Sequence, residues 1–263
     1  MGRVGRVRPV GRVVDVAAFR DLMDPASPAR RGLFVAEGRL VVRRLLSSSR
    51  FKAQSVLVTP VAFESIRDLV TPSLSCHIVA QPEMDVLVGF HMHRGCVALA
   101  ERPDVAPLTL VDRRALERVV VLEGVSNPDN LGGIFRSAAA FGAQLIVLGP
   151  GCGDPLYRKA IRTSMAATLD VPFAAAGAWP EALDALRAES LRVIALTPAA
   201  DARLLEEVPR GGRLALLFGT EGAGLSAAAQ AAADERVRIG TTGRVDSLNV
   251  SVAAAIAMHH CFE

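Results

Sequence analysis

Residues 127–143 read NPDNLGGIFRSAAAFGA, and their residue types predict a helix with marked ends. Pro128 is typical of a helix start, and Asn130 is expected to cap the first turn by accepting hydrogen bonds from backbone N–H groups. Gly142 can end the helix because glycine adopts the left-handed conformation without a steric cost. The stretch is therefore one complete helix, and a single charged residue, Arg136, stands in its middle.

The helical period separates two faces of this stretch. One face carries Leu131, Ile134, Phe135 and Ala138. Arg136 lies on another face, together with Gly132, Gly133 and Ala140. An arginine on a surface of such small residues is open to a large anion, and its guanidinium fits phosphate oxygens. From this stretch alone an arginine solvated or ion-paired on a Gly/Ala packing face is an equally open reading.

Apolar runs flank the helix on both sides and recur along the rest of the chain. They are RVVVLEG (118–124), AQLIVLG (143–149), RVIALT (192–197), LALLFG (214–219) and RVRIG (236–240). Helical patterns separate them at 130–141, 157–167 and 180–189. Continuous Val, Ile and Leu runs are typical of strands buried on both faces, so we expect an α/β domain with a parallel sheet flanked by helices.

The first part of the chain predicts a smaller α/β unit. Its expected elements are a helix at 38–48, a strand at 55–58, a helix at 61–70 and strands at 76–80 and 95–100. Residues 101–114 read ERPDVAPLTLVDRR, and two prolines with little periodicity indicate a linker.

Charge and cysteine content limit the class of protein. The net charge is only +3, but residues 1–52 hold 12 Lys and Arg against 4 Asp and Glu, which suits a polyanionic partner better than a neutral metabolite, unless this segment is merely a solvated arm. The 4 cysteines are far apart and form no C-x-x-C motif, so we expect no metal site and a reducing, cytoplasmic location. No apolar run is long enough to cross a bilayer, and no membrane association is expected.

Polar loops follow four of the predicted strands. They read VSNPDN (125–130), TPAAD (197–201), TEGAGLS (220–226) and TTGRVDSLNVS (241–251). Because the carboxyl ends of parallel strands meet at one edge of a sheet, these loops predict a ligand site there. Glu221 stands among glycines in the third loop, and Ser247 and Asn249 precede an apolar helix that either could cap. The run LGPGCGDP (148–155) has the wrong glycine spacing for a dinucleotide fingerprint.

Three segments taken together resemble one family. Residues 122–143, 214–226 and 237–256 are similar, in order and spacing, to the motifs of the SpoU, or TrmH-like, RNA 2′-O-ribose methyltransferases of the SPOUT superfamily. The resemblance implies S-adenosylmethionine as cofactor, methyl transfer to a ribose 2′-hydroxyl, a trefoil-knotted catalytic domain and a homodimer formed through that domain. LFVAEGRLVVRRLL (33–46) and HRGCVALAERP (93–103) resemble the family's ribosomal-protein-like substrate-binding domain.

The resemblance also assigns site residues and domains. Expected catalytic residues are Asn130, Arg136, Glu221, Ser247 and Asn249. Expected cofactor-binding residues are Thr197, Phe218, Gly219, Gly222, Ile239 and Leu248. The expected parts of the chain are a basic arm (1–15), an RNA substrate-binding domain (16–102), a linker (103–117) and the knotted methyltransferase domain (118–263). The partner is RNA, with ribosomal RNA favoured over transfer RNA.

The sequence departs from the family pattern at two places. Gly240 and Thr241 stand where Pro-Met often follows the equivalent of Ile239, and Ala166 stands where glycine is usual. Two other functions remain to be weighed. An RNA-binding protein could keep this fold without turnover, and cofactor binding discriminates that reading. A nucleotide-dependent dehydrogenase is disfavoured because no G-x-G-x-x-G motif is found.

Overall fold

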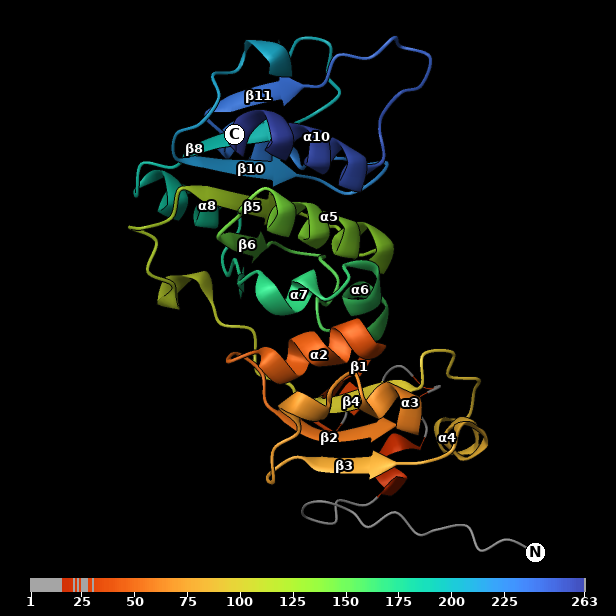
Figure 1. The fold of residues 1–263 in the computed structure, drawn as a ribbon. Coiled ribbons are helices and arrows are strands. Elements are labelled where there is room, and N and C mark those ends of the chain that lie inside the picture. The colour runs from red at the N-terminus through yellow and green to blue at the C-terminus, as the bar shows by residue number, and fades with distance from the viewer. Residues whose placement is uncertain (1–15, 21, 23, 25–27, 30, 263) are drawn as a thin grey trace, which may run out of the picture. The chain divides into compact units, whose positions relative to one another are not determined.

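The computed structural model of the chain describes residues 16–20, 22, 24, 28, 29 and 31–262. The expected basic arm at 1–15 lies outside these residues. The chain divides into two compact units, which are described separately (Figure 1). The first unit comprises the described residues up to Pro103 together with Leu156–Leu169, and the second comprises Asp104–Pro155 and the described residues from Asp170 onward.

The first unit is built on a four-stranded sheet in the order β1-β4-β2-β3. The strands are β1 (Leu33–Glu37), β4 (Cys96–Glu101), β2 (Ala53–Val58) and β3 (Ser75–Ile78). β4 runs antiparallel to both neighbours, and β2 and β3 are parallel. The helical elements are η1 (Val16–Phe19), α2 (Arg39–Ser47), α3 (Pro60–Phe63), η2 (Arg67–Leu69), α4 (Gln81–Val88) and α6 (Arg158–Thr163). Phe19, Leu57, Met84 and Leu99 lie in its buried core.

Local chemistry explains where this unit differs from expectation. The predicted helix at 61–70 is wrong as a single element, because α3 ends after one turn and a separate 3-10 turn follows. Thr59 caps α3 by accepting from the Ala62 N–H, and Pro60 occupies its first turn. β1 and α4 were not expected. Within the first unit, an ion pair anchors α6: the Nη2 atom of Arg158 lies 2.6 Å from Oε2 of Glu37.

Ala166 now has a structural explanation. Its backbone φ is 73°, in the left-handed region, and the residue is 0% exposed. Glycine is favoured in this conformation because its lack of a Cβ removes the steric conflict. Glycine would meet this backbone requirement without strain, and alanine meets it here at some conformational cost.

The second unit contains a seven-stranded sheet in the order β7-β6-β5-β10-β8-β11-β9. The strands are β5 (Arg118–Leu122), β6 (Leu145–Leu148), β7 (Phe173–Ala175), β8 (Arg192–Leu196), β9 (Arg203–Leu204), β10 (Leu214–Phe218) and β11 (Glu235–Arg238). Every pairing in it is parallel, which confirms the predicted parallel sheet. The short strands β7 and β9 were not expected.

Helices cover both faces of this sheet. The helical elements of the second unit are η3 (Leu108–Leu110), α5 (Pro128–Ala140), α8 (Glu181–Arg187), η4 (Leu205–Glu207), α9 (Ala227–Ala232) and α10 (Val250–Phe262). The sequence boundary between the two units falls within α7 (Ala167–Asp170). Val119 and Val121 of β5 share one buried cluster with α8 and α9. α5 and α10 lie side by side, as Figure 1 shows in green and blue. Among the described residues, no helix is both long and apolar enough to cross a membrane.

The start of α5 corrects one expectation. Asn127, not Asn130, is the N-cap, and its side-chain oxygen accepts a hydrogen bond from the Asp129 N–H at 2.8 Å. Pro128 is the first helical residue, so Asn130 lies within the first turn and its side chain is available for other contacts. Gly142 adopts φ of 71° immediately after the helix, as predicted.

Candidate cofactor and catalytic site

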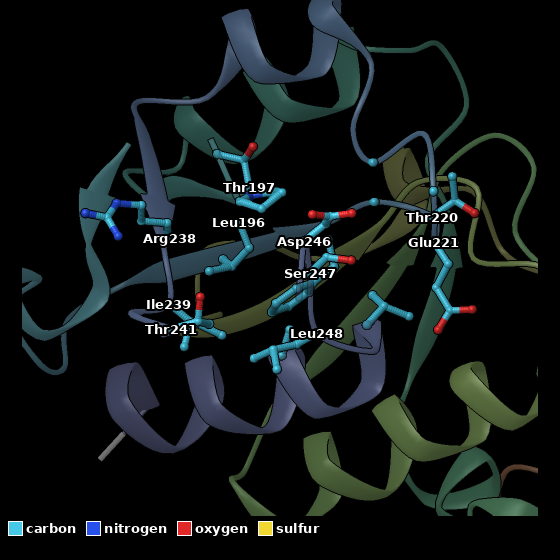
Figure 2. A pocket seen from close by; sticks show the side chains of 17 residues that line it. Leu196, Thr197, Thr220, Glu221, Arg238, Ile239, Thr241, Asp246, Ser247 and Leu248 are labelled. Atoms are coloured by element: carbon cyan, nitrogen blue, oxygen red, sulfur yellow. The ribbon is translucent and has the colours of Figure 1, made fainter. Parts of the chain in front are cut away.

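A cavity in the second unit is formed where three strands of the sheet end (Figure 2). Its walls come from the loops after β8, β10 and β11 and from the first turns of α10. This position at the carboxyl edge of a parallel sheet is the one the polar loops predicted. All six residues expected to contact a cofactor line it: Thr197, Phe218, Gly219, Gly222, Ile239 and Leu248.

The cavity wall also contains residues that were not predicted. Two of them are charged, Arg238 and Asp246, and others include Pro198, Thr220 and Thr241. Figure 2 shows the Asp246 carboxylate near the centre of the view, with Thr197 and Thr220 to either side. Together with Glu221 it places two carboxylates at the cavity. Four of these five residues lie in the predicted polar loops, and Arg238 is the last residue of β11, so their place in or beside those loops was the signal that could have identified them.

The turn after β10 requires its glycines. A Cβ on Gly219 would lie 2.3 Å from the carbonyl carbon of Gly224, a separation that no side chain tolerates. The turn is closed by a hydrogen bond from the Gly224 N–H to the Thr220 oxygen at 3.1 Å. Gly222 and Gly224 have φ of 86° and 70°, in the left-handed region. The sequence TEGAGLS therefore specifies a compact turn whose backbone forms part of the cavity wall.

Asn249 connects two other predicted catalytic residues, Asn130 and Glu221. Its Oδ1 accepts from the Ser251 N–H at 3.0 Å, so this residue does act as a helix cap, as one reading allowed. That contact fixes the orientation of the amide. Its Nδ2 then donates to Asn130 Oδ1 at 2.8 Å and to Glu221 Oε1 at 2.6 Å. Residues of all three sequence motifs thus meet at one side chain.

Asn130 is left with donors to spare. Because Asn249 Nδ2 can only donate, the oxygen of the Asn130 amide must face it, and the Asn130 NH2 group points elsewhere. This NH2 group makes no hydrogen bond to any residue that the structure describes, although Asn130 is only 7% exposed. Ser247 also lines the cavity and has no hydrogen-bond partner in the described part of the chain. Ser247 therefore offers a free hydroxyl at the cavity, whereas Asn130 and Asn249 lie outside its lining.

Arg136 stands apart from this network. It is exposed, does not line the cavity, and forms no hydrogen bond or ion pair with the residues that the structure describes. The expected bare surface around it is only partly present. A Cβ on Gly133 would lie 2.9 Å from the Ser251 Cβ, so this glycine allows α10 to approach α5, whereas Ala140 is exposed. Gly133 is thus a packing glycine, and Arg136 is solvated and not ion-paired among the described residues, which leaves both readings of this arginine open.

The glycine-rich run after β6 has a packing role. A Cβ on Gly149 would lie 2.6 Å from the Leu122 oxygen, and one on Gly153 would lie 2.7 Å from the Ser126 oxygen. These glycines let the 149–153 loop lie against the loop that leaves β5. The backbone contact accounts for the glycines without a dinucleotide.

The cysteine thiols do not offer a nucleophile. Burial raises the pKa of Cys76 to about 11, of Cys96 to about 12 and of Cys261 to about 11. Burial also raises the pKa of the Cys152 thiol. All four are free, and thiols with such pKa values stay protonated at neutral pH.

Comparison with known proteins agrees with the fold and the site. The model of the SpoU rRNA Methylase family matches residues 117–259, more than half of the chain. A protein of Mycobacterium bovis named as an uncharacterized tRNA/rRNA methyltransferase is 41% identical over 252 residues, covering 92% of this chain and 86% of its own. The Bacillus subtilis 23S rRNA (guanosine(2553)-2′-O)-methyltransferase RlmP is 27% identical, covering 93% and 94%.

Solved structures extend the similarity to the whole fold. An AdoMet-bound rRNA methyltransferase from Sinorhizobium meliloti has a TM-score of 0.78 at 26% identity and covers 97% of both chains. An RNA 2′-O ribose methyltransferase has a TM-score of 0.75 at 28% identity and covers 93% of both. A parallel α/β sheet with a ligand cavity at its carboxyl edge defines the class, and the family match specifies it. The chain belongs to the SpoU rRNA methylase family of RNA methyltransferases.

Proposed function

We propose that this chain transfers the methyl group of S-adenosylmethionine to a ribose 2′-hydroxyl of ribosomal RNA. One observation carries this proposal: the cavity is lined by all six residues that the family resemblance assigned to the cofactor, next to the Asn130, Asn249 and Glu221 network. The relative RlmP, which acts on 23S rRNA, and the AdoMet-bound structural neighbour both support it.

The cavity suits this cofactor chemically. S-adenosylmethionine carries a positive sulfonium, and the carboxylates of Glu221 and Asp246 at the cavity favour a cationic ligand. The backbone of the glycine turn can approach an adenine edge closely. Thr197, Phe218, Gly219, Gly222, Ile239 and Leu248 hold the cofactor. Gly240 and Thr241 leave the turn after β11 without the Pro-Met pair, and Thr241 still lines the wall.

The bound cofactor supplies an activated methyl group, so the protein has to position the hydroxyl and stabilise charge on its oxygen. The free NH2 group of Asn130 donates a hydrogen bond to the ribose. A guanidinium has hydrogen-bond donors and no acceptor, so Arg136 holds an anion and does not act as a base. It binds an RNA phosphate and stabilises the developing alkoxide, while the proton of the hydroxyl passes to solvent water at this exposed face. Glu221, Ser247 and Asn249 orient the sugar and the loops.

The rest of the chain fits RNA handling. The first unit acts as the RNA substrate-binding domain (16–102), preceded by the basic arm (1–15) and followed by the linker (103–117). The methyltransferase domain (118–263) contains the trefoil knot of the family. The segment Leu156–Leu169 falls by sequence in that domain, although it belongs to the first compact unit of the structure.

The protein forms a homodimer through α10 and the adjacent α5. Val252 and Ile256 are one helical turn apart on α10 and remain 48% and 37% exposed. Ala139 and Ala140 of α5 are exposed as well. Apolar helical surface of this kind is typical of stable dimer interfaces. A light-scattering mass near the 27.8 kDa of one chain at micromolar concentration would contradict the dimer.

Calorimetry and methylation mapping test the proposal. The protein should bind S-adenosylmethionine with a Kd near micromolar, which corresponds to roughly 8 kcal/mol. Ribosomal RNA from cells that lack the gene should lack one 2′-O-methylated nucleotide that is present in ribosomal RNA from cells with the gene. Folded protein that binds RNA but gives no heat with millimolar cofactor would favour the alternative, an RNA-binding protein without turnover.

A further inference from the structure

Glu123, the residue after β5, has a buried carboxylate that accepts three hydrogen bonds. Oε2 accepts from the backbone N–H of Ser226 at 2.8 Å. Oε1 accepts from the Ser226 hydroxyl at 2.8 Å and from the indole Nε1 of Trp179 at 2.7 Å. The residue is 9% exposed, and no cation pairs with it among the described residues. A buried carboxylate without a cation is costly, so these three donors are what make it tolerable.

Glu123 contacts both ends of the glycine turn. Its backbone N–H donates to the Phe218 oxygen at 2.9 Å, where the turn begins. Its side chain holds Ser226, where the turn ends and α9 starts. Between these ends, residues 219–222 and Gly224 form part of the cavity wall. The residue directly after β5 therefore fixes the distance between the two ends of the glycine turn.

The same residue starts the loop that leads to Asn130. Gly124 follows Glu123 and lies against Thr220. A Cβ placed on Gly124 would lie only 3.1 Å from the Cβ of Thr220. The carboxylate itself does not line the cavity, so it does not touch the ligand there. It can act only through the turn that it holds.

We propose that Glu123 is a positioning residue, which sets the affinity for S-adenosylmethionine by bracing the turn between Phe218 and Ser226. This inference rests on the proposed assignment of the cavity to that cofactor. Trp179 shares the carboxylate but lies outside the turn, so the contacts to Ser226 carry the effect and the contact to Trp179 does not.

Three variants separate bracing from general stability. Glu123→Gln keeps the shape of the side chain but replaces one acceptor oxygen by an NH2 group that faces a donor. Ser226→Ala removes the hydroxyl donor while leaving Glu123 in place. Trp179→Phe is the matched control, because it also removes one hydrogen bond from this carboxylate and retains an aromatic ring.

The readouts are the Kd for S-adenosylmethionine by calorimetry, kcat with saturating RNA and cofactor, and the melting temperature. Glu123→Gln should raise the Kd at least tenfold while kcat falls less than about threefold, a KM-against-kcat split that lost ground-state binding produces. Ser226→Ala should also raise the Kd, and the double variant should fall short of the product of the two effects because both act on one contact. Trp179→Phe should lower the melting temperature with an unchanged Kd.

Two results would overturn the inference. An unchanged Kd in Glu123→Gln and Ser226→Ala, with lower melting temperatures, would make Glu123 a stabilising residue only. A Kd that rises equally in Trp179→Phe would also overturn the inference, because the contact to Trp179 would then matter as much as the contacts to Ser226. If circular dichroism shows that Glu123→Gln is unfolded, the Ser226→Ala value decides alone. The wild-type protein is measured first, because its failure to bind the cofactor would overturn the assignment of the cavity itself.

Discussion

The Nδ2 of Asn249 lies 2.8 Å from the Oδ1 of Asn130, so two residues 119 positions apart in sequence share one hydrogen bond. This contact joins the start of α10 to the first turn of α5, and the same nitrogen reaches Glu221 at 2.6 Å. The direction of the bond leaves the Asn130 NH2 group free to donate. The proposed mechanism therefore depends on Asn249 as a donor and not only as a helix cap.

Asn249→Asp should separate these two roles. An aspartate still accepts from the Ser251 N–H and caps α10, but it cannot donate, and it places a carboxylate beside Glu221. The methylation rate with saturating substrates should fall about 10²-fold, the effect of disturbing a catalytic hydrogen-bond donor. The matched control is Asn127→Asp, the same change at the N-cap of α5, which should leave the rate within about twofold. Equal rates for the two variants would contradict the network.

Arg136 is expected to act in the transition state. Arg136→Ala should lower the single-turnover methylation rate by about 10²-fold or more, with little change in cofactor affinity, because the residue does not line the cavity. Arg136→Lys should recover little activity, since an ammonium cannot make a two-pronged contact with phosphate. An unchanged rate in Arg136→Ala would show that this exposed arginine has no part in the chemistry.

Arginines of the 1–52 segment provide the contrast to Arg136. Their removal should weaken RNA binding and reduce its dependence on salt, because each phosphate contact releases a counterion. The rate at saturating RNA should stay the same. A lower rate at saturation would place these arginines in the chemistry and not only in binding.

Gly219 should be intolerant of any side chain. Gly219→Ala would force apart the turn after β10, since the new Cβ would lie 2.3 Å from the Gly224 carbonyl carbon. We expect at least a tenfold loss of cofactor affinity by calorimetry. Gly212→Ala is the control, because Gly212 has open space around it and is constrained only by its positive φ of 86°. That variant should cost about 1 kcal/mol of stability and leave cofactor affinity unchanged. Similar affinities for both variants would argue against the turn as the cofactor wall.

The buried thiols predict a loss of stability at alkaline pH. Burial holds the pKa of Cys76 and Cys261 at about 11 and that of Cys96 at about 12, above the value near 8.5 of a thiol in an unfolded chain. Between about pH 9 and 11 the unfolded chain therefore binds fewer protons than the folded one, and the free energy of unfolding falls as pH rises. Urea midpoints at pH 8, 9 and 10 should drop more steeply for the wild type than for a variant with these cysteines replaced by alanine. Parallel slopes would contradict the predicted linkage.

Much of the second unit could be predicted because its strands are continuous apolar runs. Each of the five expected strands is present, and burial on both faces explains why period-two alternation was not needed to find them. The two-residue β9 and three-residue β7 are too short to produce a pattern. In the first unit, the sequence pattern did not indicate β1, because Leu33–Glu37 is followed almost directly by the helical pattern of α2.

Several of the residues that line the site could be predicted from the sequence, whereas the hydrogen bonds between them could not. The loops at the strand ends indicated the cavity, and the six proposed cofactor residues do line it. An amide at a helix start predicts a cap at Asn130, whereas the structure gives that role to Asn127, the amide three residues earlier. Neither the hydrogen bond from Asn249 nor the contact between Glu123 and Ser226, 103 positions apart, leaves a local signal in the sequence. Such contacts depend on which strands become neighbours.

Methyl transfer to the ribose can be measured directly. The purified protein is incubated with S-adenosylmethionine carrying a labelled methyl group and with ribosomal RNA from cells that lack the gene, and the digested nucleosides are identified by mass spectrometry. We expect the label in a single 2′-O-methylated nucleoside. Label on a base, or no label from folded protein that binds the cofactor, would contradict a 2′-O-methyltransferase.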